Sequence, residues 1–330
     1  GKPRIDFKDD AKGALLLEPQ RSNSFSYSEP IANSGSASGI SYESFIWSLG
    51  FTNCVKFGDN SAVRFRYGGS VLASTQYTVS AFVVMDDLSE PLVGNGSSVG
   101  DFSFVAGGIV GGVVNSNVYY GNNIYRVSTT LTSGSNLGNN GVIKYTTQSS
   151  KGFRITGFQA EVGSYPTSYI PTQGSAVTRV AETAIDGAAE APIFSNTSAV
   201  WFIDFSRFGY DSSINSAAIT LNNSSNVEQI RFHFDQPTQT VRFRDAKNSF
   251  SNIGVSINTF SNIRKKVALK IDGTTLKVFS DGQQIGSDYT RPNAFDINSM
   301  DLQSSAFNLF ETKFYNTTLS DAELQALTTL

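Results

Sequence analysis

The sequence is poor in the residues that most catalytic and metal-binding sites require. It contains one cysteine, Cys54, and one histidine, His233. A single cysteine excludes an intrachain disulfide framework and a cysteine-based metal cluster, so we expect Cys54 to be a small apolar core residue. Nucleophilic catalysis by a Ser-His-Asp or Cys-His set would depend entirely on His233.

Charged residues are scarce as well. They make up 16% of the chain, and the net charge is −3. This balance gives no electrostatic footprint for nucleic acid, and no lysine-rich run points to an anionic membrane. No apolar run reaches the length of about 18 residues that a transmembrane helix needs. We therefore expect neither nucleic-acid binding nor membrane insertion.

Glycine is abundant, at 29 residues, among many Ser, Asn and Thr, while hydrophobic residues make up 39% and aromatics 12%. This composition suits strands joined by many turns. Period-2 alternation is typical of half-buried strands and recurs along the chain. It predicts strands over residues 62–67, 77–84, 123–131, 141–146, 152–162, 199–205, 217–221, 229–234, 240–245, 267–271 and 275–280.

Turn and cap residues add detail to this pattern. Asp272-Gly273 and Asp281-Gly282 predict tight hairpin turns, and residues 236–239 predict another hairpin. Ser320 can cap a helix over residues 321–327, with Glu323 at the capping-box position. The fold class that follows is all-β, with two tandem antiparallel β-sandwich domains.

The length of 330 residues is enough for two domains of about 150 residues each. Residues 172–192 show no sustained alternation and hold Gly174, Gly187, Pro192 and many alanines. We place the junction there, which gives domains at 1–178 and 179–330.

The second domain resembles laminin-G-like, concanavalin-A-like jelly rolls. The resemblance is clearest over residues 265–330, in the hairpins at Asp272-Gly273 and Asp281-Gly282 and in the closing phrase FYNTTLSDAEL at 314–324. This phrase is similar to the last strand and terminal helical turn of that family. The resemblance implies that this domain is a jelly-roll sandwich.

The first domain resembles the galactose-binding-like jelly rolls of phage tail proteins and carbohydrate-binding modules. Residues 15–23 (LLLEPQRSN) with Tyr27-Ser28-Glu29 resemble an entry strand, and residues 77–81 (YTVSA) a central strand. Residues 155–179 (ITGFQAEVGSYPTSYIPTQGSAVTR) resemble the exit strand and linker. The resemblance implies a virion-surface or extracellular location.

Residues suited to catalysis are sparse. We expect His233 to be a solvated sheet histidine that shares a polar face with Arg231 and Asp235. Paired catalytic carboxylates would need acidic residues alternating on one strand; Glu311 has Leu309 and Lys313 at that spacing. We therefore expect no enzyme activity. The alternative is a polysaccharide lyase or hydrolase, or its accessory binding module.

A cationic stripe on one hairpin is the leading candidate for ligand binding. Alternation places Arg231 and His233 on the same face as Arg242 and Arg244, with the intervening aromatic residues in the core. Guanidinium groups pair bidentately with carboxylate or sulfate, so this stripe suits an anionic sugar. The alternative is that Asp235, Asp245 and solvent neutralise the stripe.

Exposed aromatic side chains are a second candidate, because sugar-binding modules present flat rings to pyranose faces. Trp47, Tyr42, Tyr119 and Tyr120 lie outside clear core alternation and are candidates to line a glycan cleft. Aromatic residues are more often core, which is the alternative for each of them. Trp201 lies within an apolar strand, and we assign it to the core.

Calcium is the one cofactor that the family resemblance suggests. Glu18 and Glu161 lie near the two ends of the first domain, and with backbone carbonyls they are candidates for a structural calcium site. The simpler interpretation is a pair between Arg21 and a carboxylate that ties the ends of the domain together. We interpret Asp86, Asp87 and Glu90 as a solvated turn.

Together these features predict a non-enzymatic component of a phage virion that binds a host cell-surface glycan or receptor. Its partners would include other virion proteins, and several copies in a homo-oligomer would strengthen binding through multivalency. A purely architectural virion protein without a ligand is the remaining alternative.

Overall fold

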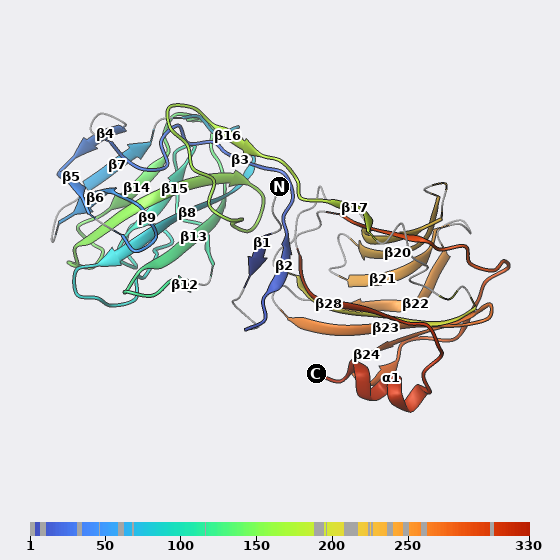
Figure 1. Cartoon of the computed structure of the whole chain (residues 1–330). Coiled ribbons are helices and arrows are strands. Elements are labelled where there is room, and N and C mark those ends of the chain that lie inside the picture. Colours follow the sequence, from blue (N-terminus) through green and yellow to red (C-terminus); the bar gives the residue numbers. More distant parts are fainter. Residues whose placement is uncertain are drawn as a thin grey trace. The chain divides into compact units, whose positions relative to one another are not determined.

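The computed structural model describes residues 4–6, 11–31, 35–45, 47–58, 63–67, 69–115, 117–187, 195, 197–207, 217–223, 225, 227–235, 240–246, 251–258, 263–303 and 307–330. Within them the chain is nearly all β-strand, with one short helix (Figure 1). The sheets are built from antiparallel pairs. The predicted all-β class with antiparallel sandwiches is therefore confirmed. No helix of the described part has the length and apolar character needed to cross a membrane.

Contacts divide the chain into two compact units. The first unit is Arg21–Val180, and the second unit comprises Ala181–Leu330 together with Gly1–Gln20. This division differs from the predicted domains 1–178 and 179–330 at the N-terminus. The physical reason is that the apolar strand β2 (Ala14–Leu17) pairs with β28 (Phe307–Tyr315), so the start of the chain completes a sheet of the second unit.

The first unit is a sandwich of two sheets. Its seven-stranded sheet runs β11 (Val113–Val114), β13 (Tyr125–Thr132), β8 (Gln76–Met85), β15 (Phe153–Val162), β6 (Asn53–Phe57) and β5 (Ile40–Ser44), with β12 (Val118–Tyr119) also on β13. Its five-stranded sheet runs β10 (Ile109–Val110), β9 (Ser103–Ala106), β14 (Gly141–Lys144), β7 (Val63–Tyr67) and β4 (Gly35–Ser38). The strands β3 (Arg21–Asn23) and β16 (Val177–Arg179) pair separately and join the two ends of the unit.

Alternating apolar side chains of this unit meet between its sheets, as the period-2 pattern predicts. Val79, Val83, Phe153 and Phe158 belong to this buried cluster. A second cluster, around Trp47, contains Cys54, Phe51 and Phe82. Cys54 is thus a core residue as expected, and burial, with the negative charge of Glu43 as the next contribution, raises the pKa of its thiol to about 11.

The second unit is also a two-sheet sandwich. Its eight-stranded sheet runs β1 (Arg4–Asp6), β2, β28, β18 (Ser198–Arg207), β23 (Arg264–Asp272), β24 (Thr275–Ser280) and β25 (Gln283–Gln284), with β26 (Tyr289–Thr290) also on β24. Its six-stranded sheet runs β17 (Ala184–Gly187), β27 (Ser299–Leu302), β19 (Ala217–Asn222), β20 (Glu228–Asp235), β21 (Thr240–Asp245) and β22 (Ser251–Asn258). Helix α1 (Asp321–Thr328) contacts β23, β24 and β25.

The local signals of this unit are confirmed with one shift. Ser320 and Glu323 form the predicted capping box of α1. The turn at Asp281-Gly282 has both residues at positive φ, 53° and 73°, as a tight hairpin turn of this kind requires. The other turn lies one residue later than predicted, because Asp272 still pairs with Thr275 and the loop is Gly273-Thr274.

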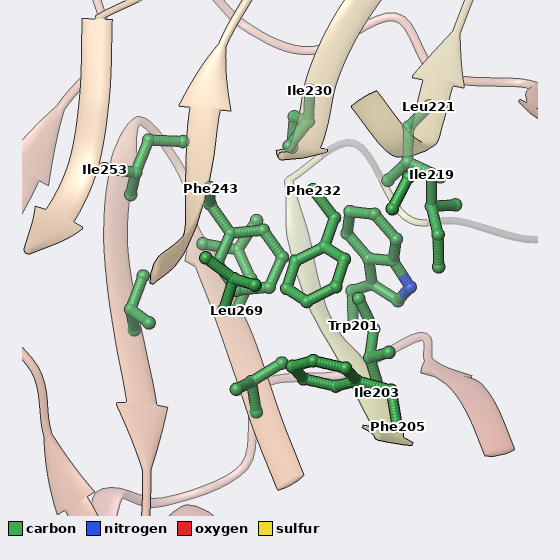
Figure 2. Packing of buried hydrophobic residues seen from close by; sticks show 14 of the residues in the cluster. Trp201, Ile203, Phe205, Ile219, Leu221, Ile230, Phe232, Phe243, Ile253 and Leu269 are labelled. Atoms are coloured by element: carbon green, nitrogen blue, oxygen red, sulfur yellow. The ribbon is translucent and has the colours of Figure 1, made fainter. Parts of the chain in front are cut away.

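The core of the second unit fixes the orientation of the cationic hairpin. Phe232, Phe243 and Trp201 are fully buried, as predicted for Trp201. Figure 2 shows these rings side by side, with ring centroids 5.4 Å apart for Trp201 and Phe243 and 5.3 Å apart for Phe232 and Phe243. Since successive side chains of a strand point to opposite faces, the residues between these aromatics must lie on the other face of the sheet.

Candidate functional site

The candidate site is the face of β20 and β21 that points away from the core. Pairing places Arg231 directly opposite Arg244, and His233 directly opposite Arg242. Directly opposite residues of an antiparallel pair share a face, so the structure brings these side chains together as the alternation predicted. The hairpin turn at 236–239 and the side chain of Asp235 lie outside the described residues.

The arginines of this cationic face are half-buried. The histidine was expected to be solvated, but it is buried. His233 is only 2% exposed. Since β20 is an inner strand between β19 and β21, the longer side chains around it can screen a side chain of imidazole length. The expectation of an exposed His233 is therefore wrong.

The pKa of His233 reflects first its burial and then the positive charges around it. Burial, followed by the charges of Arg244, Arg231 and Arg242, lowers the pKa of His233 to about 4. Burial and the charge of Arg244 also lower the pKa of Arg242, although a guanidinium remains a cation at neutral pH. The imidazole is thus neutral at pH 7, and the charge of the face comes from its arginines.

Acidic neighbours offset part of this charge. Glu228 binds Arg231, with 2.6 Å between Arg231 Nε and Glu228 Oε2. Asp245 instead lies on the core side of β21, where Arg291 Nε donates to it over 2.9 Å and both side chains are fully buried. A carboxylate held in a buried ion pair contributes little to neutralising the opposite face. This argues against the alternative that Asp245 neutralises the cationic stripe.

The strands beside the hairpin extend this face with polar groups. Thr220 of β19 lies opposite Arg231, and Asp301 of β27 lies opposite Thr220. Asn222 donates to Asp301 over 2.8 Å. A row across the sheet therefore carries a carboxylate, a hydroxyl and guanidinium groups. Thr220 is fully buried, so its hydroxyl supports the face from within and does not reach a ligand. Thr220 and Asp301 could not be predicted as neighbours of the hairpin, because strand order is not encoded in local alternation.

The aromatic candidates belong to the first unit and are not equivalent. Trp47 is 2% exposed and packs in the core cluster with Phe51 and Cys54. It cannot present a ring to a sugar, so that prediction is corrected. Tyr42 packs against the main core of the unit. Tyr119 and Tyr120 are exposed, at 58% and 43%.

The residues proposed for calcium fall in different units. Glu161 is fully buried in β15, where Thr167 N donates to it over 2.9 Å and the Thr167 hydroxyl donates to its other oxygen. Glu18 belongs to the second unit, where Glu18 N donates to Glu182 over 2.9 Å. Within the described part of the chain, no group of three or more His, Cys, Asp or Glu residues is arranged to hold a metal ion. Calcium stays a prediction, which an unchanged melting temperature between chelator and added calcium would contradict.

Other residues singled out in the sequence have structural partners. Arg21 donates to the Tyr165 hydroxyl over 3.2 Å and lies over its ring. In the acidic turn, Asp86 pairs with Arg154 over 3.0 Å and Asp87 with Lys151 over 2.9 Å. Arg21 thus has an aromatic partner within its own unit, and Asp86 and Asp87 are each paired with a cation.

A pair of carboxylates that the sequence did not reveal lies on the eight-stranded sheet. Asp204 of β18 is directly opposite Glu311 of β28. Each has its own cation: Arg264 binds Asp204 through two hydrogen bonds of 2.8 Å, and Lys313 binds Glu311 over 2.7 Å. A pair formed between two strands leaves no alternating acidic pattern along either strand, so the sequence does not reveal it.

No family model matches the chain, and no curated protein matches it. Solved structures similar to parts of it include a Trypanosoma rangeli sialidase, at 16% identity and a TM-score of 0.34, covering 40% of this chain and 23% of the sialidase. The carbohydrate-binding module CBM66 from Bacillus subtilis is 12% identical with a TM-score of 0.29, covering 36% of this chain and 76% of the module. Chicken galectin 2 is 15% identical with a TM-score of 0.27, covering 36% of this chain and 89% of the galectin. The chain thus spans less than a quarter of the sialidase, and the proposal below rests on the geometry of the cationic face.

Proposed function

We propose that the chain binds an acidic glycan without transforming it, through the face of β20 and β21 that carries Arg231, Arg242 and Arg244. In this proposal the chain is a host-attachment component of a phage virion. The glycan lies across the face and the guanidinium groups hold its carboxylates or sulfates.

The observation that carries the proposal is the placement of Arg231 directly opposite Arg244. Like charges in this position destabilise a sheet. Glu228 offsets part of this cost at Arg231, and a bound anion would offset more of it, because guanidinium groups pair bidentately with carboxylate and sulfate. Two adjacent strands hold the cations in place, so little side-chain order would have to be acquired on binding.

The non-enzymatic part of the proposal is supported by the lowered pKa of His233. A general base works best with a pKa near the working pH, and the pKa of His233 is lowered to about 4. The carboxylate pair Asp204 and Glu311 is bound by Arg264 and Lys313. These contacts favour binding over the alternatives of a lyase or a hydrolase.

The virion context is supported by the sequence resemblance alone. Residues 15–23, 77–81 and 155–179 resemble the jelly rolls of phage tail proteins. In that setting several copies of the chain would act together, and a weak site would give strong attachment through multivalency.

The test is a binding and turnover screen with polygalacturonate, hyaluronate and heparin. Binding would be measured by calorimetry, and product release by reducing-end and unsaturated-uronate assays. We expect binding to at least one polysaccharide and no product. Product formation would support the lyase or hydrolase alternative, and no binding to any member would support the purely architectural one.

A further inference from the structure

The first unit contains a cleft of about 570 Å³. None of the ligand-binding candidates named above lines this cleft. Its walls come from two stretches that the chain brings together, after β3 and after β15, with the start of β6 beside them. Its lining residues are Tyr27, Ser28, Glu29, Ile31, Thr52, Asn53, Pro171, Thr172, Gln173, Ser175 and Val177. The volume is in the usual range of small-molecule sites, roughly 300–1,000 Å³.

Hydrogen bonds fix the shape of this cleft. Tyr27 and Gln173 form an isolated antiparallel bridge, and Gly174 N donates to Ser26 O over 2.7 Å. The buried Ser28 hydroxyl accepts from Thr172 N over 2.8 Å and from the Tyr169 hydroxyl over 2.6 Å. Walls held in this way are preformed, which lowers the entropic cost of binding.

The hydroxyl end of Tyr27 lies near Gly174 of the opposite wall. Gly174 has φ +101°, and a Cβ built on it would lie 3.7 Å from the Tyr27 hydroxyl oxygen. The backbone of Gly174 therefore passes close to the end of the phenol ring. Tyr27 is half-buried, so it can offer part of its ring and its hydroxyl to a ligand.

The cleft keeps polar atoms that are not used within the described part of the chain. Glu29 accepts from Thr52 N through Oε2, over 3.1 Å, and no bond of the described residues uses its Oε1. Asn53 donates from its Nδ2 to Thr52, and its amide oxygen is similarly unengaged. The side chains of Tyr27, Gln173 and Ser175 make no hydrogen bond within the described residues.

A second cleft of about 570 Å³ in the same unit shows the contrast. It contains Asp101 and Lys151, but Asp101 accepts from Leu92 N over 2.7 Å and from the Ser149 hydroxyl. Lys151 binds Asp87 over 2.9 Å. The two charged groups Asp101 and Lys151 of this second cleft are therefore already engaged with neighbouring residues.

We propose that the cleft lined by Tyr27, Glu29, Asn53 and Gln173 binds a neutral oligosaccharide, as a second ligand site independent of the cationic face. Sugar hydroxyls both donate and accept hydrogen bonds, and the lining offers a carboxylate and amides to meet them. Tyr27 and Pro171 offer apolar surface to the C–H face of the ring. Glu29 is the one charged residue among the described lining residues, so an anionic ligand would meet repulsion without a compensating cation.

The experiment is a titration of the full chain with maltotriose, cellotriose, mannotriose and chitotriose, followed by calorimetry and saturation-transfer NMR. We expect at least one trisaccharide to bind, with an affinity that does not change with salt. Glu29→Gln, which keeps the acceptor for Thr52 N, should weaken binding about tenfold, the loss of one hydrogen bond to a charged group. Tyr27→Ala should weaken it by a similar factor.

Controls separate this site from the other candidates. Tyr119→Ala removes an exposed tyrosine of the same unit outside the cleft, and it should leave the affinity unchanged. Arg242→Ala with Arg244→Ala should also leave it unchanged, so failure of the proposed acidic-glycan site does not affect this test. If Tyr27→Ala does not fold, as judged by circular dichroism, Gln173→Ala replaces it, because this exposed side chain has no partner among the described residues.

Three results would overturn the proposal. The first is that no trisaccharide of the panel binds. The second is that binding survives in folded Glu29→Gln and Tyr27→Ala or Gln173→Ala proteins. The third is that the arginine substitutions abolish binding, which would place the neutral sugar on the cationic face instead.

Discussion

At the scale of single residues, alternation on β21 separates stability from binding. Phe243 is fully buried, while Arg242 and Arg244 lie half-buried on the opposite face. Phe243→Ala should cost about 3–5 kcal/mol of the free energy of unfolding, through the cavity it leaves. Arg242→Ala and Arg244→Ala should each change it much less and weaken binding of an acidic glycan instead.

Chemical denaturation of these variants, with acidic-polysaccharide binding measured in parallel, checks this separation. If Arg244→Ala destabilised the protein as much as Phe243→Ala, the arginine would be a structural residue. The assignment of the cationic face to binding would then lose its support.

His233 gives a pH dependence with a defined sign. Its pKa is lowered to about 4 by burial and the neighbouring arginines, below the ordinary value of about 6.5 expected in the unfolded chain. The unfolded state therefore binds more protons between these values, and stability falls as the pH is lowered through this window. The contribution is fully present above about pH 6.5 and is lost as the pH falls through about 4.

The measurement is the difference in unfolding free energy between the wild type and His233→Gln from pH 7 to pH 4. A difference cancels the titration of other groups, and glutamine does not titrate. We expect the stability of the wild type relative to the variant to decline with falling pH. A difference independent of pH would mean that His233 is not buried in its neutral form.

At the scale of elements, β2 explains why the N-terminus belongs to the second unit. Leu17 is 3% exposed and packs in the main core of that unit, opposite Phe307 of β28. Leu17→Ala should lower the free energy of unfolding of the second unit by about 2–5 kcal/mol, measured by chemical denaturation of the full chain. Leu16→Ala is the matched control in the same strand, because Leu16 is only half-buried and points to the other face.

The pairing of β2 with β28 also decides which fragments of the chain should fold cooperatively. A fragment starting at residue 191 lacks β1, β2 and β17, so it should unfold without cooperativity. The fragment 21–180 contains both sheets of its unit and should melt cooperatively. Cooperative unfolding of the 191–330 fragment would show that the pairing of β2 is dispensable.

Local patterns predicted the elements well, and they failed where the answer depends on a distant neighbour. The strands around Val79 and Phe243 and the capped helix at Ser320 follow from alternation and from a capping box. The run at 15–23 was interpreted as one entry strand, but it divides into β2 and β3, which belong to different units. Nothing in alternation says which sheet a strand joins.

The candidate sites show the same limit. The cationic face could be predicted because it is made by one hairpin. The burial of Trp47 and His233 depends on neighbouring segments, and the cleft at Tyr27 is formed by stretches more than a hundred residues apart, as the bridge from Tyr27 to Gln173 shows. The spacing of residues in the sequence does not predict which distant stretches come into contact.

At the scale of the whole molecule, the two units would divide the task of recognition. The second unit offers a cationic face. The first unit offers a cleft for an uncharged sugar, with a single carboxylate among its described lining residues. Their ligands should therefore respond differently to salt, since exposed charges are screened over about 8 Å at physiological ionic strength. Multivalent display would strengthen either site.

The most direct test of the central claim is the salt dependence of binding to the tightest acidic polysaccharide among polygalacturonate, hyaluronate and heparin. Wild type would be compared with the double variant Arg242→Gln and Arg244→Gln, which keeps polar side chains of similar length. We predict that wild-type affinity falls as sodium chloride rises, and that the double variant binds weakly with a shallower salt dependence. Equal affinity and equal salt dependence in the two proteins would contradict the assignment of glycan binding to β20 and β21.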